Sequence, residues 1–74
     1  MTVEPGDAVR LAIDWVCIGD DSKMSPRPAG TVLCIIAVLP LDSERIVISA
    51  LDLAGAHLRL RLPLRSLSVL LERP

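Results

Sequence analysis

Residues 57–62 read His-Leu-Arg-Leu-Arg-Leu, and this strict alternation constrains the fold more than any other segment. A period of two places the three leucines on one side and His57, Arg59 and Arg61 on the other. This is the pattern of a β-strand with one buried and one solvated face. Pro63 ends the strand, because proline cannot donate to a β-ladder. The rest of the chain must supply partner strands and a core for these leucines.

Three further segments are predicted to be strands. Residues 31–39 are apolar on both faces, which is typical of a strand inside a closed barrel or one covered by a partner. Residues 45–51 are predicted to form another strand. Residues 8–15 alternate, and the residues expected on their inner face are Val9, Leu11, Ile13 and Trp15.

Turn-forming residues separate these segments. Residues 4–7 contain Pro and Gly and predict a turn, and residues 40–44 and 52–55 predict two connecting turns. Residues 19–28 carry two prolines and are expected to form the longest surface loop. Loops of this length often carry function.

The C-terminal segment has two interpretations. Residues 63–66 fit a short helical turn with Pro at its first position, after which residues 67–71 would form a fifth strand. Residues 59–71 are also rich in Leu and Arg, which favour helices, although Pro63 would interrupt a helix spanning them. The first interpretation gives an all-β fold of five antiparallel strands with a short helical turn before the last.

The 74 residues predict a single domain, 1–74, that buries only roughly 60% of its unfolded surface. Small scaffolds compensate with disulfides, a metal or association. Cys17, Cys34 and His57 match no zinc spacing, so no metal or cofactor is expected. Both cysteines are expected to be small buried thiols in a reducing cytoplasm, with Cys17, at the start of the loop, slightly more open to redox pairing. Whether they ever pair stays open.

Association is the remaining route to stability. Hydrophobic residues make up 51% of the chain, yet no apolar run approaches the roughly 18 residues of a membrane helix. We therefore expect a cytoplasmic protein with no membrane partner, whose surplus apolar surface meets another copy or a protein partner. The residues expected to form this self-association surface are Val32, Leu33, Ile35, Ile36 and Val38.

Nucleic-acid contact is the alternative. The net charge of −1 gives no general attraction to phosphate, and Trp15 is the only aromatic residue available for base stacking. Arginines on a strand face nevertheless suit phosphate or carboxylate contacts. The simpler interpretation, which we favour, is a solvated face that keeps the strand from uncontrolled edge pairing. The residues of this candidate anion-binding face are Arg10, Arg59, Arg61 and Arg65.

Catalytic patterns are absent from the linear sequence. His57 would need an orienting carboxylate and a nucleophile, and Asp52 is its nearest carboxylate in sequence. No phosphate-binding loop, paired-carboxylate arrangement or serine-triad signature appears. A non-enzymatic assembly module is therefore expected, with a small-ligand site or enzyme at a symmetric subunit interface as a further alternative.

Two short motifs carry a family resemblance. Pro5-Gly6-Asp7-Ala8-Val9-Arg10 and Gly30-Thr31-Val32 resemble the opening and second strands of bacterial SH3-like small β-barrels. The resemblance implies a five-stranded SH3-like barrel, a fold whose members have unrelated functions.

A more distant likeness concerns the type II plasmid dihydrofolate reductases. These are lone SH3-like barrels that act as symmetric tetramers and carry a Val-Gln-Ile-Tyr-Pro motif. Here Arg59-Leu60-Arg61-Leu62 precedes Pro63, so the Gln and Tyr of that motif are missing. The likeness implies a precedent for oligomerisation without implying that activity.

Overall fold

Three long consecutive strands form the centre of the computed structural model, which describes all residues from 1 to 74. They are β4 (Val32–Pro40), β5 (Arg45–Asp52) and β6 (His57–Pro63), each antiparallel to the next. Their register aligns Leu39 with Val47 and Val47 with Arg61, so these three residues lie side by side on the same face of the sheet. This meander is the scaffold on which all other elements lie.

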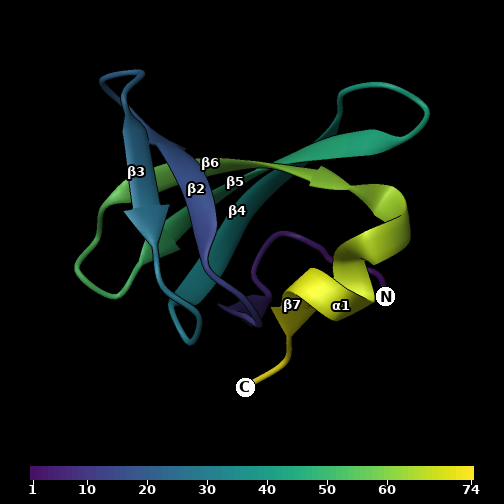
Figure 1. Cartoon of the computed structure of the whole chain (residues 1–74), viewed down its shortest axis with the longest axis horizontal. Coiled ribbons are helices and arrows are strands. Elements are labelled where there is room, and N and C mark those ends of the chain that lie inside the picture. Colours follow the sequence, from purple (N-terminus) through teal and green to yellow (C-terminus); the bar gives the residue numbers. More distant parts are fainter.

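Four shorter strands extend the meander on both sides. β1 (Ala8–Leu11) and β7 (Leu71–Glu72) continue the sheet beyond β4, whereas β2 (Trp15–Gly19) and β3 (Met24–Arg27) continue it beyond β6. The resulting order is β3-β2-β6-β5-β4-β1-β7, with every pair antiparallel. The protein is therefore all-β, with seven strands in a strongly curled half-barrel (Figure 1).

The inner face of the curled sheet forms a core of aliphatic residues and Cys17, against which Trp15 and Val38 pack. All 15 buried residues are apolar, and no polar or charged residue is among them. Leu58, Leu60 and Leu62 of β6 are at most 2% exposed, which confirms the alternation predicted for this strand. The other core residues are Val3, Val9, Leu11, Cys17, Leu33, Ile35, Ile46, Ile48, Ala50, Leu67, Leu70 and Leu71.

The strand predicted at residues 8–15 is broken by a corner. β1 ends at Leu11 and pairs with β4 and β7, whereas β2 begins at Trp15 and pairs with β3 and β6. The carboxylate of Asp14 accepts a hydrogen bond of 2.7 Å from the Ala29 N–H and ties the corner to the opposite loop. Ile13 lies in this corner and is 45% exposed, so its predicted inward position was wrong.

The surface loop predicted at residues 19–28 contains a strand. β3 pairs with β2 to form a hairpin, and the turn between them places Ser22 at a φ of 63°. Pro26 opposes Val16 within this hairpin. A proline is tolerated here because β3 lies at the edge of the sheet, where no further strand requires its missing N–H.

The C-terminal segment combines both sequence interpretations. A 3₁₀ turn, η1 (Leu64–Ser66), follows Pro63 as predicted, but α1 (Leu67–Leu70) occupies most of the expected fifth strand. Leu67 and Leu70 are both buried, which one helical turn achieves because residues three apart share a face. Only β7 remains extended. The alternative helix starting at residue 59 is also wrong, since β6 continues to Pro63.

Strand β4 is covered on one face only. Leu33 and Ile35 are 1% exposed and lie in the core, whereas Ile36 and Leu39 are 46% and 59% exposed. Alternation from Ile35 places Ile36 outward, and a β-bulge between Ile35 and Ala37 then shifts the register, so that Ala37 pairs with Ser49. The sequence pattern of a strand apolar on both faces is therefore not explained by burial within one chain.

Candidate functional site

A groove lies between the β2–β3 hairpin and the outer face of the meander. Strand β2 pairs with β6 only at Ile18 and Gly19 and then diverges from it towards Trp15. The space left between them has a volume of about 860 Å³. The residues that line this groove are Asp14, Trp15, Val16, Ile18, Ser22, Leu41, Val47, Arg59 and Arg61. We call it the hairpin groove.

Two of the four arginines predicted to bind anions come together in the hairpin groove. Arg59 and Arg61 lie two residues apart on the outer face of β6, and neither forms an ion pair. Arg10 lies on β1, three strands away in the sheet order, and its Nε is 3.6 Å from Glu72 Oε1. Arg65 lies in η1. Of the four predicted arginines, only Arg59 and Arg61 line this groove.

The only histidine joins two other side chains at the end of the hairpin. The Nδ1 of His57 is 2.7 Å from Oδ1 of Asp20, in the turn between β2 and β3. Its Nε2 forms a hydrogen bond with the hydroxyl of Ser49 on β5. Asp52, the carboxylate nearest in sequence, does not contact it. The partners of His57 lie 8 and 37 residues away, so local sequence spacing gives no sign of them.

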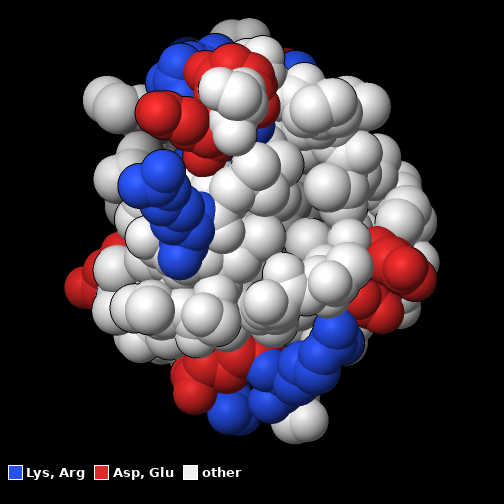
Figure 2. Space-filling view, turned by 90° about the vertical axis from the view of Figure 1, so that its right-hand side faces the viewer, with Lys and Arg blue, Asp and Glu red and all other residues white.

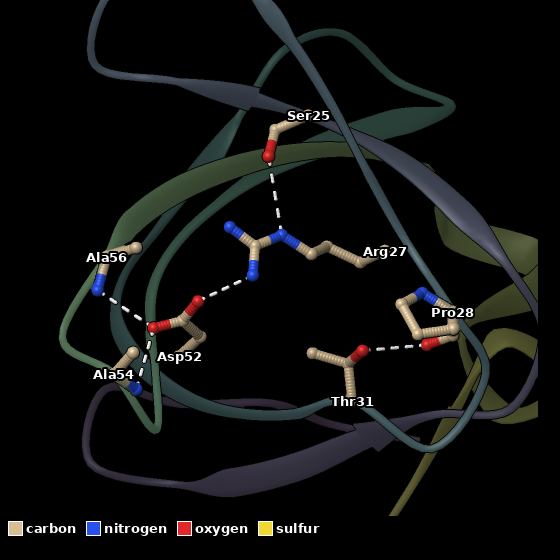
Figure 3. Close-up of polar contacts among 7 residues, drawn as sticks. All are labelled: Ser25, Arg27, Pro28, Thr31, Asp52, Ala54 and Ala56. Carbon is tan, nitrogen blue, oxygen red and sulfur yellow. Dashed lines mark hydrogen bonds and ion pairs between the residues drawn. The ribbon is translucent and has the colours of Figure 1, made fainter.

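A largely buried ion pair fixes the hairpin to the C-terminal end of β5. Nη1 of Arg27 on β3 donates to Oδ2 of Asp52 at 2.7 Å, and the two side chains are 27% and 7% exposed. Figure 3 shows them pointing towards each other inside the curl, with Ser25 accepting a further bond from Arg27. The backbone N–H groups of Ala54 and Ala56 donate to the other Asp52 oxygen.

These donors determine the ionisation of Asp52. The hydrogen bond from Ala56 and the positive charge of Arg27 hold its pKa below the ordinary value, although burial acts in the opposite direction. All of its close contacts are donors or a cation, which favour the charged carboxylate. The Arg27–Asp52 pair therefore acts as a structural clamp. Each side chain already has its hydrogen-bond partners within the chain, and together they hold the hairpin to β5.

Of the two cysteines predicted to be buried, Cys17 is buried and Cys34 is not. Cys17 on β2 is fully buried, and burial raises the pKa of its thiol, partly offset by the charge of Arg27. Cys34 lies on the outer side of β4 and is exposed. The prediction that placed Cys34 in the core was wrong because its strand has a single buried face. Both thiols are free.

The predicted self-association residues are divided between the core and the surface. Leu33 and Ile35 face inward, which corrects their assignment to a contact surface, and Val32 and Val38 are half-buried. Ile36 remains outward. The outward apolar side chains of the two strands, which we call the outer β4–β5 face, are Cys34, Ile36, Leu39, Val47 and Leu51.

The structure shows no metal cluster and no membrane-spanning helix, and comparisons with known proteins find no match. No group of three or more His, Cys, Asp or Glu side chains gathers where it could hold a metal ion. Neither helical segment is long and apolar enough to cross a membrane. No protein-family model, no curated protein and no solved structure matches this chain. Functional proposals therefore depend on the contacts described above.

The placement of the cysteines makes a direct prediction about thiol reactivity. In dilute native protein, a thiol-specific reagent such as Ellman's should modify Cys34 rapidly and Cys17 only after denaturation. Burial hides the Cys17 sulfur and disfavours the reactive thiolate. Cys34→Ser should remove the fast reaction completely. Two thiols reacting at equal rates in the folded protein would contradict this placement.

The clamp predicts a pH-dependent contribution to stability. Because the folded pKa of Asp52 is lowered, its stabilisation is present above the unfolded pKa of about 3.9 and is lost as the pH falls through the folded pKa. Asp52→Asn should therefore lower the free energy of unfolding in urea near neutral pH, and this deficit should shrink in acid. Glu44→Gln, at an exposed carboxylate without an ion pair, should show no such trend. A deficit for Asp52→Asn that is constant with pH would be evidence against the clamp.

Proposed function

We propose that this chain is a cytoplasmic assembly module that self-associates through the outer β4–β5 face. The observation that supports the proposal is the absence of charge on this face. Between Val32 and Pro40 there is no charged residue, and β5 carries charges only at Arg45 and Asp52, its two ends. Ile36 and Leu39 are about half exposed or more.

A neighbouring strand shows why this absence matters. Antiparallel sheets that face water alternate apolar residues inside with polar residues outside. β6 follows that rule, with His57, Arg59 and Arg61 outward, whereas β4 presents Cys34, Ile36 and Leu39. An apolar strand face in contact with water is unfavourable, and covering it with a second copy would remove that cost.

The exposed apolar side chains are not a consequence of an incomplete fold. The chain exposes 4557 Å², close to the roughly 4,500 Å² expected of a compact monomer of its mass. Its core is closed, and no buried side-chain polar atom lacks a hydrogen bond. Association would therefore join two folded chains. A face of this kind suits a symmetric dimer, in which the same patch meets itself.

We also propose that the architecture is of the SH3-like type. Five strands, β1, β4, β5, β6 and β7, are contiguous in the sheet, with β1 between β4 and β7. The short helical segment precedes the last of them. The β2–β3 hairpin then occupies the place of the predicted long loop. The precedent of lone SH3-like barrels that function as oligomers agrees with the assembly proposal.

The assembly proposal predicts a change of mass on one substitution. The native protein should form a dimer at micromolar concentration by size-exclusion chromatography with light scattering, and Ile36→Lys should be a monomer. Burying an unpaired ammonium costs several kcal/mol, so Kd should rise by on the order of 100-fold. Met24→Lys, at a 76% exposed site on β3, is the matched control and should remain dimeric.

A second readout separates the proposed face from any other contact. Cys34 lies on the outer β4–β5 face, so its modification should slow as the protein concentration rises and should stay fast in Ile36→Lys. A native protein of 8.0 kDa at micromolar concentration would reject self-association. A dimer in which Cys34 stays equally reactive would reject this face.

A second candidate function is contact with single-stranded nucleic acid in the hairpin groove. Trp15 packs partly against the core and also lines the groove that contains Arg59 and Arg61, neither of which forms an ion pair. Proteins that bind single strands combine stacking with cationic side chains. Elsewhere the charge is mixed. On the face that Figure 2 shows, basic groups mostly adjoin acidic ones around an uncharged area. With a net charge of −1, the chain as a whole does not attract phosphate, so the attraction would have to come from the groove.

This second function predicts a specific salt dependence. Binding of a fluorescent oligonucleotide should weaken linearly on a log–log scale with salt, because each phosphate contact releases counterions. Replacing Arg59 and Arg61 with Ala should weaken binding and lower that slope by about 1.4, or about 0.7 per contact. Arg65→Ala, outside the groove, should change neither. An unchanged slope in the double variant would exclude the groove as the binding site.

A further inference from the structure

The hydrogen-bonded series Asp20–His57–Ser49 has the connectivity of a nucleophilic catalytic site. A carboxylate oxygen contacts one ring nitrogen of His57 at 2.7 Å, and the other ring nitrogen contacts a serine hydroxyl. We propose that Ser49 is an activated nucleophile that accepts acyl groups from small activated esters held in the adjoining hairpin groove. All three side chains come from one chain, so this activity goes beyond the assembly function and does not depend on it.

Asp20 determines which nitrogen of His57 is available. By accepting a hydrogen bond from Nδ1, the carboxylate keeps the proton on that atom, and the lone pair of Nε2 is left facing Ser49. The β2–β6 pairing brings Asp20 to this position, since Gly19 opposes Leu58 and Asp20 follows immediately. The hairpin that forms the groove therefore also orients the histidine.

The position of Ser49 connects it with the groove. On β5 it lies two residues from Val47 on the same face, and its cross-strand partner on β6 is Arg59. Val47 and Arg59 both line the groove, together with Ile18, which opposes Arg59 on β2. An ester whose carbonyl carbon approaches Ser49 would place its apolar group against Ile18 and Val47.

Arg59 is the group available to stabilise the negative charge that develops on the carbonyl oxygen. Side chains directly opposite on antiparallel strands have Cβ atoms about 5 Å apart, and Arg59 Nη2 lies 3.5 Å from the carbonyl oxygen of Gly19, the residue before Asp20. We infer that a small movement of this exposed side chain would bring its charge to a tetrahedral intermediate at Ser49. The groove offers this one cationic group to the oxyanion and no helix N-terminus. Because the stabilisation of the oxyanion is then limited, we expect the substrates to be esters with a good leaving group.

The reaction balances with these groups and water alone. Ser49 Oγ forms a bond to the acyl carbon as its proton moves to His57 Nε2, and the ester C–O bond then breaks. The leaving alkoxide takes the proton from His57 and departs as the alcohol. Water attacks the acyl-serine, giving its proton to His57, which returns it to Ser49 as the carboxylic acid leaves.

The test uses the full chain carrying Cys34→Ser, because Cys34 is an exposed thiol that would itself react with activated esters. Hydrolysis of p-nitrophenyl acetate is followed together with covalent labelling by a fluorophosphonate, and peptide mass spectrometry locates the label. We expect the label on Ser49. Ser49→Ala should abolish labelling, and His57→Gln should slow hydrolysis by about 100-fold, as expected on loss of a general base.

Asp21→Asn is the matched control for Asp20→Asn. Asp21 lies in the same turn and accepts a hydrogen bond from the Lys23 N–H, which asparagine can also accept. Asp20→Asn should slow both reactions, whereas Asp21→Asn should leave them unchanged. Thermal unfolding by circular dichroism shows that each variant is folded. Labelling at another residue, or hydrolysis that persists in folded Ser49→Ala, would overturn the proposal and leave the assembly proposal unaffected.

Discussion

Burial of the leucines of β6 is the constraint on which the rest of the structure depends. Leu58, Leu60 and Leu62 are covered by an inner surface that contains only aliphatic residues and Cys17. Trp15, the only aromatic residue, packs against the edge of this core and is only partly buried. The buried interior itself is therefore closed by many small aliphatic contacts from several elements. The sheet curls to bring those elements inward, and α1 closes one end with Leu67 and Leu70.

The hairpin is held on this sheet by polar contacts at two places. The Arg27–Asp52 pair fixes β3 to the end of β5, and Asp20–His57 fixes the hairpin turn to β6. Cys17 adds a fully buried contact between them. These attachments leave β2 separated from the meander near Trp15, which creates the groove. The clamp and the groove are therefore consequences of one docking geometry.

The assembly proposal and the acyl-transfer proposal concern one continuous surface. Ser49 projects from β5 between Val47 and Leu51, on the outer β4–β5 face that a second copy would cover. Full coverage would restrict access to Ser49, whereas a contact centred on β4 would leave the side nearer β6 open to solvent. The position of a dimer axis relative to β5 would therefore decide whether assembly and acyl transfer exclude each other.

The sequence by itself determined the antiparallel β class, the inward leucines of residues 58–62 and the helical turn after Pro63, because these follow from local periodicity and proline chemistry. Only the tertiary structure decided the corner at Ile13, the hairpin within residues 19–28 and the exposure of Cys34. These features depend on which strands pair. The alternation of apolar and polar residues continues unchanged through a corner, so the sequence pattern does not show where the chain turns. The hydrogen-bonded series Asp20–His57–Ser49 could not be predicted from the sequence for the same reason. Strand pairing brings together residues that lie far apart along the chain.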